Sequence, residues 1–269
     1  MQRKLGVNCD CIQNFDPLQA LTIIKDLGYD CFFTGQNITE LATVSALKNK
    51  AEKLGLSYEF IHAPFKNVNS MWLENEQTKP FMEHIFQAID NAAAACVPQI
   101  ILHTSSTWTP PAINEAGFAR YDKLVAYAEK KNVCVAFENL RIFDYYASLL
   151  HRYKDNTFVR FCFDNGHEHW CMPERDHIHT FAHQLSCTHL HDNFGKPDPP
   201  TVNGDLHLLP FDGNYDFANM IKRLDDVGYQ GALTLEIFNT KRADYLEMRA
   251  EAFLTTAYER LKKISEYSK

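Results

Sequence analysis

Long apolar runs, an excess of positive charge and a repeated cysteine pair are all missing from this sequence of 269 residues. No apolar run approaches the roughly 20 residues that a membrane-spanning helix needs. The first residues, MQRKLGVNCDCIQNFD, turn acidic before a signal-type apolar stretch develops. We therefore expect a cytoplasmic protein with no membrane partner. The formal net charge is −7, and because an acidic surface repels phosphate backbones, a nucleic-acid partner is disfavoured.

The eight cysteines do not form a zinc-binding pattern. Cys9 and Cys11 are spaced like a metal-binding pair, but no second pair is present to complete a site. Most of the others lie in apolar segments, where a thiol behaves as a small hydrophobic side chain. We expect free thiols, which suits a reducing compartment.

What the sequence does contain is a globular composition, with 45% hydrophobic and 23% charged residues. No linker, repeat or low-complexity segment divides it, so we predict one domain over residues 1–269. Short apolar segments rich in β-branched or aromatic residues predict strands buried on both faces. They are KLGVNC (4–9), YDCFFTG (29–35), SYEFIH (57–62), PQIILH (98–103), VCVAFE (133–138), FVRFCFD (158–164), SCTHLH (186–191) and ALTLEI (232–237).

Amphipathic segments with helix start and stop signals lie between these strands. Asp16 and Pro17 predict the start of the first helix, and Gly28 predicts its end. The other predicted helices span 39–54, 79–95, 113–131, 142–152, 174–184, 215–227 and 243–266.

Eight strand–helix units in about 250 residues predict an α/β fold, a single (β/α)8 TIM barrel. An open doubly wound sheet is the alternative, but it usually carries a glycine-rich phosphate loop after its first strand, and CDCIQNFD is not one. The long connections at 63–78, 104–112 and 192–214 all follow strand C-termini, the side on which such barrels build their sites.

Polar residues at the ends of the predicted strands are the clearest functional signal. Taken singly, a strand-end histidine is more often a packing residue and a glutamate is often a solvated charge. Six at equivalent ends favour a common site, because the C-termini of barrel strands converge at one mouth. They are His62, His103, Glu138, Asp164, His191 and Glu236.

Four of these residues have the ligand chemistry of one cation site. Glu138, Asp164, His191 and Glu236 offer three carboxylates and an imidazole, which suits Mn²⁺, Co²⁺, Mg²⁺ or Zn²⁺. Three carboxylates brought close together would repel one another without a cation between them. His167, three residues after Asp164, is placed to reach a substrate oxygen beside the metal.

The chain resembles a known family, the xylose isomerase-like barrels. This family comprises sugar-phosphate isomerases and epimerases, ketose 3-epimerases and, more distantly, endonuclease IV. The resemblance runs in family order over nearly the whole chain. The matching stretches are IHAPF (61–65), IILHTSS (100–106), VAFENL (135–140), FCFDNGH (161–167), THLHDN (188–193), GDLHLLPFDGNYDF (204–217) and GYQGALTLEI (228–237).

This resemblance implies one metal ion held by Glu138, Asp164, His191 and Glu236, with the two glutamates also acting as acid and base. It implies that His167 contacts the substrate. The chain departs from the ketose 3-epimerases at Pro197, where they carry a substrate-binding arginine.

Further residues resemble ligands of the trinuclear zinc cluster of endonuclease IV. These residues either bind a second ion or contact the substrate. Because alternate residues of a strand point to the same side, the sequence does not show whether His189 or His191 is the metal ligand. This set of substrate or second-metal candidates is His62, His103, His167, His189, Asp205 and His207.

The reaction expected from these residues is isomerisation or epimerisation of a sugar or sugar phosphate. A base, Glu138 or Glu236, removes a proton beside a carbonyl, a metal stabilises the resulting enediolate, and the other glutamate returns a proton to the opposite face. The alternatives are a metal-dependent hydrolase or lyase, including an endonuclease IV-like phosphodiesterase, and a non-catalytic sugar-binding barrel. The oligomeric state, including a homo-oligomer, is left open.

Overall fold

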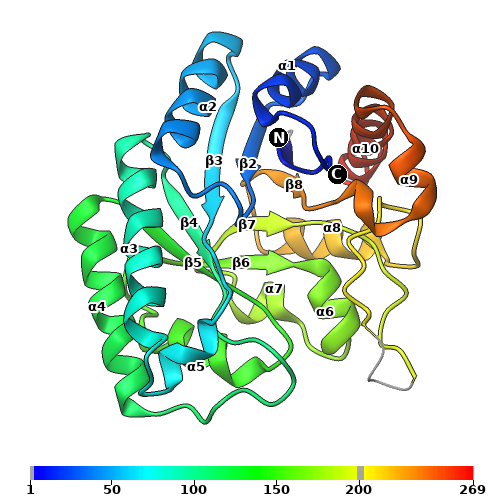
Figure 1. Ribbon diagram of the computed structural model, residues 1–269. Helices are drawn as coiled ribbons and strands as arrows, with labels where there is room; N and C mark the ends of the chain where they lie inside the picture. The colour runs from blue at the N-terminus through cyan, green and yellow to red at the C-terminus, as the bar shows by residue number, and fades with distance from the viewer. Residues whose placement is uncertain (1–2, 199–202, 269) are drawn as a thin grey trace.

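The computed structural model describes residues 3–198 and 203–268. Eight parallel strands form the centre, each made from one of the predicted apolar segments, with the helices around them (Figure 1). The strands are β1 (Leu5–Asn8), β2 (Cys31–Thr34), β3 (Ser57–His62), β4 (Gln99–Leu102), β5 (Cys134–Glu138), β6 (Val159–Asp164), β7 (Leu185–His189) and β8 (Leu233–Leu235).

The sheet is nearly closed into a barrel, which confirms the predicted (β/α)8 TIM barrel. The strand order is β7-β6-β5-β4-β3-β2-β1-β8. Between the two ends of this order, Leu190 N donates to Thr234 O at 2.8 Å, and Glu236 N donates to Leu190 O at 3.0 Å. These two bonds bring the end of β7 beside the end of β8, so the polar residues that follow both strands face one mouth.

The helices begin and end largely where the sequence places the capping signals. The Asp16 side chain accepts a hydrogen bond from Leu18 N, and Gly28 closes the helix with a φ of 100°, in the left-handed region. The longer helices are α1 (Pro17–Leu27), α2 (Leu41–Leu54), α3 (Thr78–Ala94), α4 (Glu115–Lys131), α5 (Phe143–Arg152), α8 (Phe217–Asp226) and α10 (Ala250–Ser265). The shorter ones are α6 (Asn165–Cys171), α7 (His177–Thr180), α9 (Ala243–Glu247), η1 (Val68–Trp72) and η2 (Asn239–Lys241).

Two helix predictions are wrong and one helix was missed. The predicted helix 174–184 is confined to α7, because the backbone turns after Phe181 to enter β7. The predicted helix 243–266 divides into α9 and α10, which are separated by extended backbone at Met248 and Arg249. The missed helix, α6, begins directly after β6, where the Asp164 side chain caps it by accepting from His167 N at 2.6 Å.

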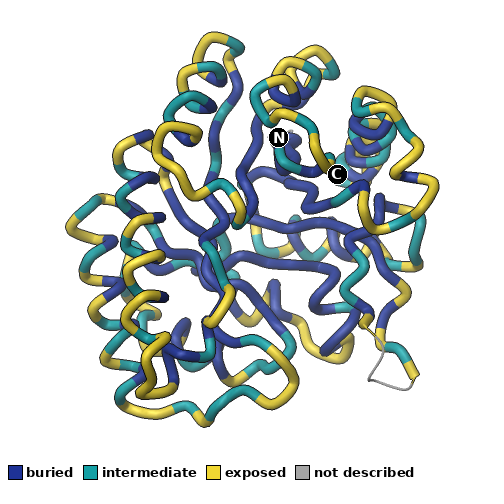
Figure 2. Tube along the Cα trace, in the orientation of Figure 1, coloured by how far each residue is buried: buried dark blue, intermediate teal, exposed yellow. Residues whose placement is uncertain are grey.

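The core has two parts. A large cluster fills the space between the strands and the surrounding helices, whose outer faces are exposed (Figure 2). A smaller cluster fills the inside of the barrel beneath the mouth and consists of Phe33, Phe60, Ile101, Ala136, Cys162 and Cys187. No helix in the described part of the chain is long and apolar enough to cross a membrane.

Candidate metal centre

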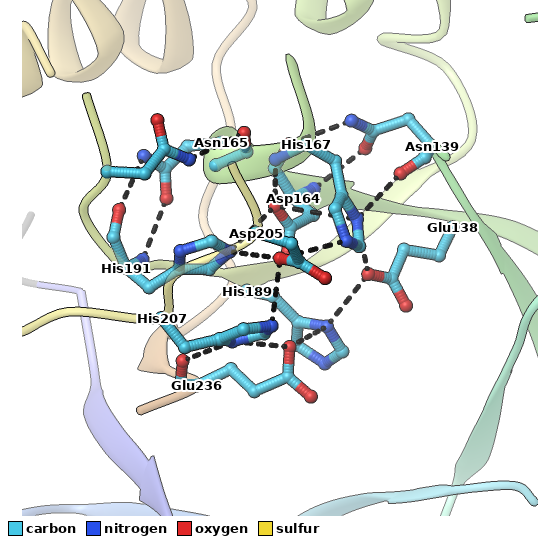
Figure 3. Close-up of polar contacts among 12 residues, drawn as sticks. Glu138, Asn139, Asp164, Asn165, His167, His189, His191, Asp205, His207 and Glu236 are labelled. Carbon is cyan, nitrogen blue, oxygen red and sulfur yellow. Dashed lines mark hydrogen bonds and ion pairs between the residues drawn. The ribbon is translucent and has the colours of Figure 1, made fainter. Parts of the chain in front are cut away.

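Histidine and carboxylate side chains converge at the C-terminal end of the barrel (Figure 3). They come from the ends of β3 to β8 and from the segment between β7 and α8, so every sequence-predicted site residue lies in this one cluster. They are His62, His103, Glu138, Asp164, His167, His189, His191, Asp205, His207 and Glu236.

One group contains three carboxylates and one imidazole. Ligand atoms of Glu138, Asp164, His189 and Glu236 all lie within 4.8 Å of one another. His189 Nδ1 is 3.4 Å from both Glu138 Oε1 and Glu236 Oε2. His191 lies further out, with Nε2 at 3.3 Å from Asp164 Oδ1 and 4.0 Å from Asp205 Oδ1. The geometry therefore places His189 in this group and His191 at its border.

Three further groups lie beside this one, and two of them share residues with it. His62 and His103 point their Nε2 atoms at Glu138 Oε2, at 3.5 and 3.2 Å. On the other side, Asp205 Oδ1 lies 3.0 Å from His207 Nε2 and 3.5 Å from His167 Nε2. The three groups are His62, His103 and Glu138; His62, His189 and Glu236; and His167, Asp205 and His207.

Many of these buried atoms have no hydrogen-bond partner among the described residues. They include both carboxylate oxygens of Glu138, Asp164 Oδ2, Asp205 Oδ1 and both ring nitrogens of His189 and His191. Buried polar atoms are normally satisfied, and leaving one unpaired costs about 1–3 kcal/mol. Oxygen and nitrogen atoms that converge without hydrogen-bond partners are suited to bind a divalent cation, which would interact with several of them at once.

Backbone carbonyls hold three of the imidazole rings. Nδ1 of His62 lies 2.8 Å from Ala63 O, that of His207 lies 2.9 Å from Glu236 O, and that of His167 lies 3.0 Å from Asn139 O. A carbonyl only accepts, so each Nδ1 is the donor, and Nε2 of each ring is left to face the site. This arrangement is typical of metal-ligating histidines.

Asparagines that directly follow the carboxylates hold the strand ends together. Asn139 accepts from Asp164 N at 2.7 Å and donates to Asp164 O at 2.7 Å. Asn165 accepts from His191 N and donates to His191 O, both at 2.9 Å. Sequence reasoning missed these residues, although the Glu-Asn and Asp-Asn pairs at the ends of β5 and β6 were a readable signal.

Helix α6 approaches the site closely at Gly166. A Cβ atom added there would lie 1.9 Å from Cε1 of the His191 ring, so no other residue fits without moving that imidazole. The helix carries His167 into the site, with Nδ1 at 3.1 Å from Glu138 Oε1. His169 also lies on α6, with Nε2 at 2.8 Å from Asn214 Oδ1.

The buried carboxylates and imidazoles shift one another's pKa values. Burial alone would raise the pKa of Glu138, but His189 and His103 outweigh it and hold that pKa well below its usual range. Burial would lower the pKa of His189, but Glu236 and Glu138 raise it to about 10. Without a cation, His189 is therefore held as an imidazolium between carboxylates. A cation bound here would displace its proton, as metal binding to histidine requires.

A cavity of about 210 Å³ opens beside these groups. Glu236, His62, His103, His167, Asp205 and His207 line it, together with residues that sequence reasoning did not select. The latter are Asp10, Gly35, Gln36, Asn37, Phe65, Phe238 and Lys241. Lys241 is the one Lys or Arg that lines this cavity in the described part of the chain.

The three tryptophans, Phe194 and Arg141 lie outside the lining of this cavity. Trp72 and Trp170 are buried, while Trp108 and Phe194 are exposed outside the cavity lining. The Arg141 guanidinium lies over the Trp170 ring, 4.6 Å from its centroid, and 3.9 Å from Asp205 Oδ2. Phe65 and Phe238 line the cavity, and Phe65 stacks on His103 with ring centroids 4.2 Å apart.

Comparison with known proteins gives one family and several similar structures. The family described as xylose isomerase-like TIM barrel matches residues 21–263. A protein of Sinorhizobium fredii, y4fM, is 30% identical over 174 residues, which cover 60% of this chain and 53% of that protein, so the chain spans about half the length of this relative.

Two solved structures share the fold over nearly their whole length. The crystal structure of a D-tagatose 3-epimerase-like protein has a TM-score of 0.75 and 20% identity, and the match covers 98% of this chain and 97% of that one. D-psicose 3-epimerase from Clostridium cellulolyticum H10, solved with D-tagatose, has a TM-score of 0.72 and 15% identity, with 98% of each chain covered. At these identities the likeness concerns the fold.

Proposed function

Because the chain belongs to the family of xylose isomerase-like TIM barrels, we propose that it is a divalent-metal-dependent isomerase or epimerase of a small sugar or sugar phosphate. The observation that carries this proposal is the group of Glu138, Asp164, His189 and Glu236, whose ligand atoms lie within 4.8 Å of one another. The structural relatives whose names include a ketose 3-epimerase add support from the same fold.

The four residues of this group would hold the cation. Carboxylate oxygens and one imidazole nitrogen suit Mn²⁺, Co²⁺, Mg²⁺ or Zn²⁺. When bound, such an ion supplies positive charge that polarises a substrate carbonyl and stabilises the enediolate formed from it.

The two glutamates would move the proton. Glu138 is the last residue of β5 and Glu236 directly follows β8, so their carboxylates approach the site from different parts of the barrel wall. One accepts a proton from the carbon beside the carbonyl, and the other returns a proton to the opposite face, which inverts that carbon. Return of the proton to the neighbouring carbon gives aldose–ketose isomerisation instead.

The cavity limits what can reach the site. Glu236 lines it directly, whereas Glu138 is buried behind three histidines that line the cavity and contact its carboxylate, His62, His103 and His167. Its volume of about 210 Å³ suits a molecule of sugar size, and its lining is polar on most sides. The net charge of −7 disfavours a duplex nucleic acid as substrate. His62, His103 and His167 line the same cavity, and we assign them to contacts with substrate oxygens or to a further ion.

Turnover in deuterated water tests the proposal. Metal-loaded protein offered D-tagatose, D-psicose, other ketoses, aldoses and their phosphates should place solvent deuterium on the carbon beside the carbonyl. Glu138→Gln and Glu236→Gln should each lower that exchange by about 10²–10⁴-fold. Metal content is measured in the same variants, because loss of the ion would also stop exchange. Absence of exchange with every sugar in the panel would overturn the proposal.

A second candidate function is supported by the additional ligand groups. Glu138 belongs to two groups and Glu236 to two, so more than one ion could be held at short separation, as in hydrolases of phosphate esters. The same assay includes duplex DNA with an abasic site and simple phosphodiesters. Cleavage of either substrate without deuterium exchange in any sugar would favour the hydrolase.

A further inference from the structure

One side of the barrel mouth contributes no residue to the ligand groups found among the described residues. The ligand groups come from β3 to β8 and the segment after β7, whereas the loops after β1 and β2 contribute Asp10, Gly35, Gln36 and Asn37 to the same cavity. Within residues 3–198 and 203–268, Asp10 belongs to none of the ligand groups, although it lines the cavity beside them.

The position of Asp10 is built by the backbone on both sides of it. Cys9 N donates to Phe33 O at 2.9 Å and ties the two loops together. Gly35 N then donates to Asp10 Oδ1 at 3.0 Å and fixes the carboxylate. A Cβ added at Gly35 would lie 2.4 Å from Asp10 Oδ2, so the glycine makes room for this carboxylate. A fixed carboxylate with one oxygen tied to the backbone leaves the other as an acceptor in the cavity.

The chemistry of this side matches hydroxyl groups. A carboxylate accepts hydrogen bonds from hydroxyls, and the amides of Gln36 and Asn37 both donate and accept. Asp10 would repel a phosphate or carboxylate group of a substrate. The positively charged residue that lines the cavity, Lys241, belongs to η2, which follows β8 and not β1 or β2.

We infer that Asp10, with Gln36 and Asn37, binds hydroxyl groups of the substrate at the β1–β2 side of the mouth, and that it selects a neutral polyhydroxylated end there. This inference rests on the proposed sugar isomerase or epimerase function. Asp10 is thereby a residue that determines specificity, separate from the glutamates that transfer the proton.

The test uses the ketose from the panel above with the highest kcat/KM, together with its analogues that lack one hydroxyl at carbon 4, 5 or 6. Asp10→Asn keeps the size of the side chain and removes its charge. It should raise KM for the complete ketose about 10–100-fold, the loss typical of a hydrogen bond to a charged group, with a smaller effect on kcat. For one of the deoxy analogues the variant and the unaltered protein should have the same KM, because the lost contact is already missing.

Two further variants keep the test decisive. Gly35→Ala should displace the carboxylate and raise KM in the same direction, while Asp26→Asn, on the exposed face of α1, should leave KM and metal content unchanged. Equal KM values for Asp10→Asn and unaltered protein on every sugar would overturn the inference and leave the isomerase proposal standing. A protein that exchanges deuterium into no sugar at all would overturn both.

Discussion

The imidazole rings at the barrel mouth differ in what holds them, and this difference separates their roles. Carbonyl oxygens fix Nδ1 of His62, His167 and His207, whereas both nitrogens of His189 lack a hydrogen-bond partner in the described structure. His189 also packs on Phe33, with ring centroids 5.2 Å apart, so the inner core of the barrel supports it from below. It is therefore oriented by packing and left with nitrogens for a cation.

Substitution of the two neighbouring histidines should distinguish their roles. His189→Ala removes the imidazole of the four-residue group. It should weaken Mn²⁺ or Zn²⁺ binding by at least roughly 10–100-fold, which is the loss typical of removing a residue that only hydrogen-bonds to a metal ligand. His191→Ala should weaken it less. Isothermal titration of metal-free protein gives both affinities, with the exposed His179→Ala on α7 as the control. A larger loss for His191→Ala would exchange the two assignments.

The sequence could predict which residues gather at this site, but not which of them lie closest to the carboxylates. His189 and His191 share a side of the chain, and only the depth of each ring relative to Glu138 and Glu236 separates them. Asp10 was missed because it lies two residues beyond β1 in a stretch with several polar residues, and only the bond from Gly35 N shows where its carboxylate points.

Among the helices, α6 connects the candidate metal centre to a buried polar network. Glu168 on α6 accepts from Arg223 Nη2 of α8 at 2.6 Å, and its Oε2 lies 2.9 Å from His177 Nδ1 of α7. The other nitrogen of His177 lies 2.8 Å from the Tyr146 hydroxyl of α5. This network ties four helices together directly behind the residues that α6 carries into the site.

Breaking this network should cost more than breaking a comparable pair on the surface. Glu168→Gln leaves Arg223 with the longer pair to Asp176 Oδ1, at 3.4 Å, and should lower the free energy of unfolding by about 2–4 kcal/mol. Asp122→Asn, whose exposed partner Arg152 also bonds in a bidentate manner, should cost less than about 1 kcal/mol. Urea denaturation measures both losses. Equal losses would show that the network adds nothing beyond an ordinary ion pair.

The strands were predictable because each is a continuous apolar run, and eight such runs alternating with amphipathic segments admit few folds. Helix α6 was not, since NGHEHWC has no apolar periodicity and its formation depends on the cap from Asp164. The division of 243–266 into two helices accompanies the packing of α9 against η2, which no local pattern in the sequence predicts.

For the whole molecule, barrel closure is what turns scattered residues into one centre. Asn8 donates to Ile237 O at 3.1 Å and accepts from Ile237 N at 3.2 Å, and the bonds of Leu190 complete the ring from β7 to β8. Glu138 and Glu236, 98 positions apart, reach a common space only in the closed barrel. Binding of a divalent cation in this space thus depends on the closed fold as well as on the ligand residues.

Anomalous diffraction from crystals loaded separately with Mn²⁺, Co²⁺ and Zn²⁺ tests this binding most directly. We predict a peak between the carboxylates of Glu138, Asp164 and Glu236 and the ring of His189, and its loss in Asp164→Ala. Further peaks beside His103 or His207 would mean that the centre holds more than one ion. The absence of any peak at the four-residue group with all three ions would contradict the account.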